Sequence, residues 1–140
     1  MVSDCVNEIT FLGSTETIQE LIENQCNPEV YLPTPAHEPD DLSWVSWRYQ
    51  NWGTKRFYGF HIVSKGAKGL VYKTTTVRGP PIPFFKHLLE KFSDLQIKCQ
   101  FKVEESVSGV WIARRVDGEL SVKEVIWEDF EDEEYYEAFN

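Results

Sequence analysis

The residue spacings that usually mark a catalytic or metal site are missing from this sequence. Its three cysteines (Cys5, Cys26 and Cys99) and three histidines form no Cys-x-x-Cys or His-x-x-x-His pattern. The glycines of Lys65-Gly66-Ala67-Lys68-Gly69 lie between two predicted strands and open no helix, so they form no phosphate-binding loop. We therefore expect no enzyme activity, no metal and no cofactor, and we expect the cysteines to be buried, reduced thiols. A Cys–His nucleophile pair or a small-molecule site would have to be assembled by the fold alone.

Long apolar runs are missing too. None approaches the roughly 18 residues that a membrane-spanning helix needs. The start, Met1-Val2-Ser3-Asp4-Cys5, lacks the basic and apolar segments of a signal peptide. With 140 residues, 41% of them hydrophobic, the chain is too apolar for a disordered protein and suits one domain with one core. We expect a cytoplasmic protein without membrane contact.

The chain divides into three parts, and in each part charged residues of one sign are scarce. Residues 1–41 contain nine acidic residues and no Lys or Arg, whereas residues 42–103 contain eleven Lys and Arg but only two acidic residues. Residues 104–140 are acidic again, with twelve acidic residues against three basic ones. The net charge of −9 therefore conceals three blocks of alternating sign. Such blocks can neutralise one another across a folded surface, or they can face different partners.

What is present is a clear alternation of strand and helix patterns. Predicted strands cover 2–12, 56–63, 70–77, 97–103, 110–116 and 119–126, and predicted helices cover 15–25 and 83–92. Asp117-Gly118 is a strong two-residue hairpin signal between the last two strands. Two strand–helix–strand units predict an α+β fold of the ferredoxin-like split β-α-β-β-α-β type, a sandwich of one antiparallel sheet with both helices on one face. The last two strands add a C-terminal hairpin.

The predicted domain covers 1–126 and the predicted acidic, aromatic tail covers 127–140. Four of the seven prolines fall within 27–43, so we expect a long loop without regular structure there. Three of the five tryptophans follow within 44–52, and such a concentration of rings must be buried, stacked or exposed for binding. Asn51-Trp52-Gly53 is typical of a tight corner.

Several short motifs resemble the YubB-like ferredoxin-like family of phage, prophage and plasmid proteins. They are Cys5-Val6-Asn7 with Gly13, Asn51-Trp52-Gly53-Thr54-Lys55, Gly79-Pro80-Pro81-Ile82-Pro83 and Lys91-Phe92-Ser93-Asp94-Leu95. The resemblance spans roughly 4–112, and its most specific part is the Asn-Trp-Gly-Thr-Lys segment. Family members usually have an aromatic residue where this chain has Arg56, and the acidic tail is not part of the family pattern. The resemblance implies the fold and a mobile-element setting, but no activity.

The C-terminal segment repeats carboxylates among aromatic rings. The residues that we expect to bind a partner are Glu128, Asp129, Glu131, Asp132, Glu133, Glu134, Tyr135 and Tyr136. Such a segment can mimic nucleic-acid phosphates toward a basic protein, or dock on a basic surface. Our leading hypothesis is a small acidic accessory protein, monomer or homodimer, that binds and modulates a host protein, for example as an anti-defence inhibitor. Two alternatives for the tail are a solvated segment and a segment that covers this protein's own basic face.

Basic and aromatic residues interleave in the middle block, which supports a different function. The candidates are Arg48, Trp52, Lys55, Arg56, Tyr58 and Lys73. On a sheet they would offer single-stranded nucleic acid both phosphate attraction and stacking platforms. The simpler interpretation is that one side of each strand is core and that the lysines keep the protein soluble. The net negative charge of the whole chain also opposes nucleic-acid binding.

Overall fold

The sheet is organised around β1 (Asp4–Leu12), which pairs with a strand on each side. In the computed structural model, which describes residues 3–128, β1 is antiparallel to both β3 (Gly69–Val77) and β4 (Gln96–Val103). The side chains of β1 alternate between the two faces of the sheet, as they do in any strand. The four that face the core are Cys5, Asn7, Ile9 and Phe11. The first strand is therefore confirmed, whereas the apolar Val6 and Leu12 lie on the opposite, exposed side.

Six antiparallel strands make up the described sheet, in the order β2-β3-β1-β4-β5-β6. The remaining strands are β2 (Tyr58–Lys65), β5 (Val107–Val116) and β6 (Glu119–Glu128). The β5–β6 hairpin is confirmed, because Asp117 (φ 51°) and Gly118 (φ 81°) have the two positive φ angles of a type I′ turn. The predicted hairpin of β2 and β3 is confirmed as well.

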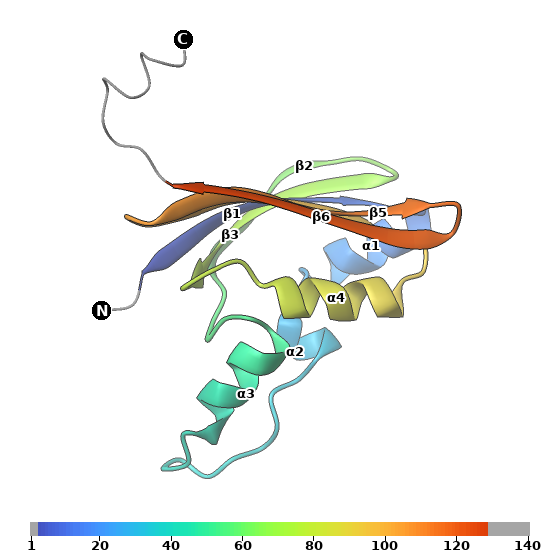
Figure 1. Ribbon diagram of the computed structural model, residues 1–140. Coiled ribbons are helices and arrows are strands. Elements are labelled where there is room, and N and C mark those ends of the chain that lie inside the picture. Colours follow the sequence, from blue (N-terminus) through green and yellow to red (C-terminus); the bar gives the residue numbers. More distant parts are fainter. Residues whose placement is uncertain (1–2, 129–140) are drawn as a thin grey trace.

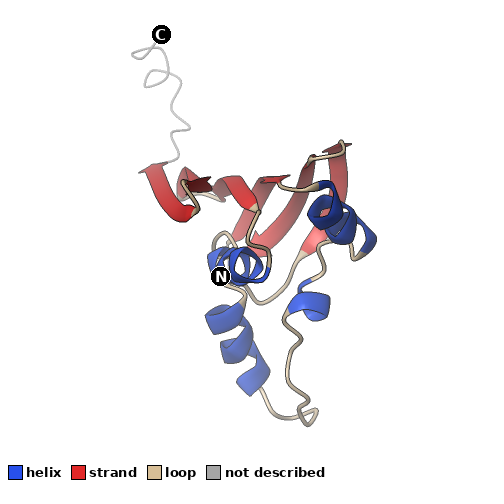
Figure 2. Ribbon diagram, turned by 90° about the vertical axis from the view of Figure 1, so that its right-hand side faces the viewer, coloured by secondary structure: helices blue, strands red, loops and turns tan. Residues whose placement is uncertain are grey.

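All helices of the described chain lie on one side of this sheet, as Figures 1 and 2 show. The two predicted ones are α1 (Thr15–Glu23) and α4 (Ile82–Lys91). The Ser14 hydroxyl accepts a hydrogen bond from the Thr17 backbone N–H and so caps α1. The Asp94 carboxylate accepts the Ser14 backbone N–H at 2.6 Å, which lowers the pKa of Asp94 and ties α1 to the segment after α4.

Two further helices lie within the proline- and tryptophan-rich region. The prediction that 27–43 lacks regular structure is wrong at its start, because α2 (Pro28–Tyr31) forms there with Pro28 in its first turn. The longer α3 (Ser43–Asn51) was not predicted at all. None of its residues is fully buried. The helix therefore needs no apolar stripe, and its sequence lacks the spacing that reveals an amphipathic helix.

The corner after α3 depends on a glycine. Gly53 has φ +82°, and a Cβ atom on it would lie 2.6 Å from Cδ of Pro83. Any other residue would therefore be strained and would push α4 away from α3. The corner predicted at Asn51-Trp52-Gly53 thus joins the two helices closely.

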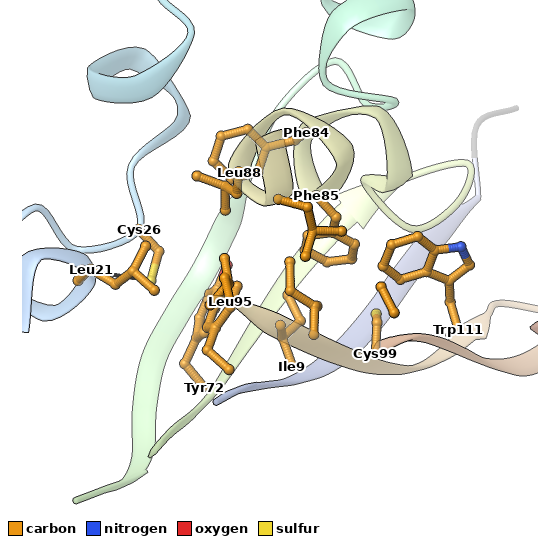
Figure 3. Close-up of a cluster of buried hydrophobic side chains, with 14 of the residues drawn as sticks. Ile9, Leu21, Cys26, Tyr72, Phe84, Phe85, Leu88, Leu95, Cys99 and Trp111 are labelled. Carbon is orange, nitrogen blue, oxygen red and sulfur yellow. Dashed lines mark hydrogen bonds between the residues drawn. The ribbon is translucent and has the colours of Figure 1, made fainter. Parts of the chain in front are cut away.

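The core lies between the sheet and α4. Phe84, Phe85, Leu88 and Leu89 of α4 are buried against it, and the Phe85 ring stacks on Trp111 of β5 with 5.6 Å between centroids (Figure 3). One polar side chain is buried among these groups. The Asn7 amide nitrogen donates hydrogen bonds to the carbonyls of Cys5 and Thr74 and to the Thr76 hydroxyl. Its oxygen accepts from the thiols of Cys5 and Cys99, so the amide is fully paired.

Candidate interaction surface

No described helix covers the sheet face opposite α1 and α4 (Figure 2). We call it the open face. Its composition follows from strand register. Val6 lies beside Lys102, Lys102 beside Ser108, and Ser108 beside Trp127, which makes one row across β1, β4, β5 and β6. Two rows further along, Thr10, Lys98, Ile112 and Lys123 form an equivalent row.

Basic side chains outnumber acidic ones on the open face, where Asp4, Glu8 and Glu119 also lie. The basic ones are Lys73, Lys98, Lys102, Arg114 and Lys123. Lys73 forms an ion pair with Glu8 of β1 at 3.7 Å. Lys98 and Lys123 flank Ile112, and Lys98 and Arg114 line a shallow hollow of about 110 Å³ on β1, β4 and β5. The arrangement alternates positive charges with aliphatic side chains, and only Trp127 adds an exposed aromatic ring at the β6 side.

The two edge strands of the sheet differ strongly. The register of β2 shifts twice against β3, and Gly59 within it has φ +63°. Such bulges protect an edge from pairing with another chain. In contrast, β6 pairs with β5 over ten residues without a shift, and no other described strand pairs with its outer edge. Large apolar residues are exposed on both of its sides, namely Leu120, Val122, Val125, Ile126 and Trp127.

The tryptophan-rich segment forms a packed cluster around Arg48. The Arg48 guanidinium lies 4.6 Å from the ring centroids of both Trp44 and Trp52. It also donates to the Lys55 carbonyl at 3.0 Å and forms an ion pair with Glu29 at 3.3 Å. Trp52 is only 2% exposed, and its indole N–H donates to the Leu32 carbonyl. Two of the six residues predicted to bind nucleic acid are therefore engaged within the protein.

The other four candidates are divided between two places. Lys55, Arg56 and Tyr58 line an open hollow of about 480 Å³ together with Val77. The Tyr58 hydroxyl donates a hydrogen bond to the Asp4 carboxylate. Lys73 lies on the open face of β3 in its ion pair with Glu8. The fold thus brings three of the six together and does not build the single basic, aromatic surface that the sequence suggested.

Of the residues predicted to form the acidic binding tail, only Glu128 is described. It is the last residue of β6 and pairs with Val107, so the sheet extends two residues past the predicted domain boundary at 126. The rest of the set, from Asp129 to Tyr136, lies outside the described residues.

The cysteines are free and buried, as predicted. Burial raises the pKa of Cys5 to about 11 and that of Cys26 to about 12, and it raises the pKa of Cys99 as well. The three thiols therefore stay protonated near neutral pH, and a thiol is a far weaker nucleophile than a thiolate.

Within residues 3–128, no three His, Cys, Asp or Glu side chains are grouped so that they could hold a metal ion. In the same stretch, no helix has the length and apolar character that crossing a membrane would require.

The open face could have been found only in part from sequence. Lys98, Gln100 and Lys102 alternate with buried residues in β4, which already marks one polar side of that strand. Arg114 and Lys123 join them only because β5 and β6 continue the sheet beyond β4, which no single-strand pattern reveals. Comparison of the chain with protein-family models, with curated proteins and with solved structures finds no match.

Proposed function

We propose that this chain is a protein-binding accessory protein whose contact surface is the open face together with β6. The observation that carries the proposal is the concentration of exposed, large apolar side chains on uncovered strands. They are Val6, Leu12, Val116, Leu120, Val122, Val125, Ile126 and Trp127. Val6, Leu12, Val116, Val125 and Trp127 lie on the open face, whereas Leu120, Val122 and Ile126 lie on the other side of β6. Exposed apolar side chains with charged residues around them are typical of protein interfaces.

The strand order supports a ferredoxin-like assignment for the first four strands. In β2-β3-β1-β4, α1 precedes β2 and α4 joins β3 to β4, as in the split β-α-β-β-α-β arrangement. On this assignment, α2 and α3 are insertions before β2, and the β5–β6 hairpin is an addition that widens the open face. The resemblance to phage and plasmid proteins directs the search for a partner to proteins of the host cell, including its defence and nucleic-acid-processing factors.

Affinity capture from nuclease-treated host lysate, read by mass spectrometry, tests the proposal. Three baits are compared: the native chain, Val125→Asp on the open face, and Val30→Asp on α2 as the matched control. Both valines are more than half exposed, at 62% and 52%, so both variants should fold. We expect a host protein that is recovered with the native and control baits and lost with Val125→Asp. Equal recovery with all three, or no specific protein, would contradict the proposal.

A single-stranded nucleic acid is the second candidate, because the cations of the open face would attract phosphates. The native chain is titrated into a fluorescent oligothymidylate at two salt concentrations. Binding that weakens steeply with salt and is lost in Lys98→Glu would favour this function over protein binding. Lys86→Glu on α4 makes the same charge change on the helix side and serves as the control.

A further inference from the structure

We propose that residues 129–140 of the same chain dock on the open face and mask it. The proposal rests on the open face being the contact surface of the protein, and it adds a means of regulation. The uncovered strands offer positive charges and aliphatic side chains at once. The natural occupant of such a surface is an acidic segment that also carries apolar rings.

The chain contains one segment with this chemistry. Residues 129–140 include six acidic residues and no Lys or Arg. They also include four aromatic residues, Phe130, Tyr135, Tyr136 and Phe139. All fourteen Lys and Arg of the protein precede this segment. The carboxylates of this segment are opposite in charge to Lys98, Arg114 and Lys123, and its rings are apolar like the exposed side chains Val125 and Trp127 of the open face.

The point where the segment begins also favours the open face. It follows β6 directly, and Trp127 near the end of β6 lies on the open face in a row with Ser108 and Lys102. On the other side of β6, Glu124 and Glu128 lie next to Trp111 and Val107 and would repel an acidic segment. At the end of β6, the helix side therefore presents Glu124 and Glu128 to the segment, whereas Lys123 lies on the open face.

The segment is long enough to reach its site. Twelve residues span at most about 40 Å when extended, whereas β6 and β1 are three strand spacings apart, or roughly 15 Å. Because the segment is attached to β6, its effective concentration at the open face is in the millimolar range. A weak, salt-sensitive interaction is therefore sufficient to keep the face covered until a partner with a stronger acidic, apolar element displaces the segment.

Lysine acetylation rates, measured by mass spectrometry, test this in the full-length protein. The native chain is compared with a full-length variant in which Asp129, Glu131, Asp132, Glu133, Glu134 and Glu137 are changed to the corresponding amides. We expect Lys98 and Lys123 to react at least about threefold more slowly in the native chain, and the protection to disappear in 0.5 M salt. Lys86 on α4 is the internal control and should react equally in both proteins.

Three results would overturn the proposal. They are equal rates at Lys98 and Lys123 in the two chains, an equal change at Lys86, and protection that grows with protein concentration, which would assign the occupant to a second copy.

The lysate capture separates this proposal from the proposed function. Protection without any captured protein would leave the masking intact and reject the protein-binding function. Equal acetylation rates, together with a host protein that is captured by the native chain and lost with Val125→Asp, would reject the masking and support the protein-binding function.

Discussion

The two faces of the sheet differ in burial and in composition. On β5, Trp111 is 2% exposed and stacks on Phe85, whereas its neighbour Ile112 lies on the open face between two lysines. The covered face is mainly apolar and contains paired polar groups such as Asn7, whereas cations and aliphatic side chains alternate on the open face. Since strand residues alternate between faces, adjacent positions report on stability and on binding separately.

The sharpest test of this comparison uses that adjacent pair. Trp111→Ala removes a buried ring and should lower the free energy of unfolding by about 3–5 kcal/mol. Ile112→Ala should cost about 1 kcal/mol or less. Urea denaturation of both variants measures the difference. Similar losses in the two would mean that the open face is packed against something in solution.

The α3 cluster should contribute less than the core. Arg48→Ala removes two ring contacts and several charge-assisted hydrogen bonds, and we expect a loss of about 2 kcal/mol in unfolding free energy. Because the cluster is built from tryptophans, the near-ultraviolet circular dichroism should change as well. Arg56→Ala, at an exposed position, is the control and should change neither quantity appreciably.

Alkaline pH should lower the free energy of unfolding, because the buried thiols resist deprotonation in the folded protein. The folded-state pKa of Cys26 is about 12 against an ordinary value of 9.0, so the unfolded chain releases this proton first. Stability is therefore complete below pH 9 and falls as pH rises toward the folded-state pKa. The fall should be about 1.4 kcal/mol per pH unit for each buried thiol. Urea denaturation at pH 8 to 11 under reducing conditions should show a shallower slope in Cys26→Ala, and an unchanged slope would contradict this.

The smallest expected effect is an increase, rather than a decrease, in the free energy of unfolding. Tyr72 is buried, and its hydroxyl has no hydrogen-bond partner among the described residues. Tyr72→Phe should therefore raise the free energy of unfolding by about 1 kcal/mol, because an unpaired buried hydroxyl is removed while the ring remains stacked on Phe11. Destabilisation in the same urea experiment would show that the hydroxyl is paired in solution.

Sequence patterns predicted the strands well and the tryptophan-rich region poorly. β4 was evident because its buried and exposed residues alternate strictly, and the β5–β6 turn was evident because Asp117-Gly118 accepts positive φ. In contrast, α3 is held by ring stacking around Arg48 rather than by an apolar stripe, so it left no periodic signal. The candidate surface was predicted only in part, because most of its cations come from strands that are neighbours only through the topology.

The buried Asn7 also determines how β1 can be assembled. Its amide finds partners on β3 and β4 only when Asn7 lies opposite Thr74 and Phe101. A β1 strand that slipped by two residues would keep its apolar residues inside but would bury the amide without these partners. Asn7 therefore adds little net stability, yet it discriminates the native pairing from its nearest misaligned competitors. During folding, Asn7 therefore disfavours a sheet in which β1 is paired two residues out of register.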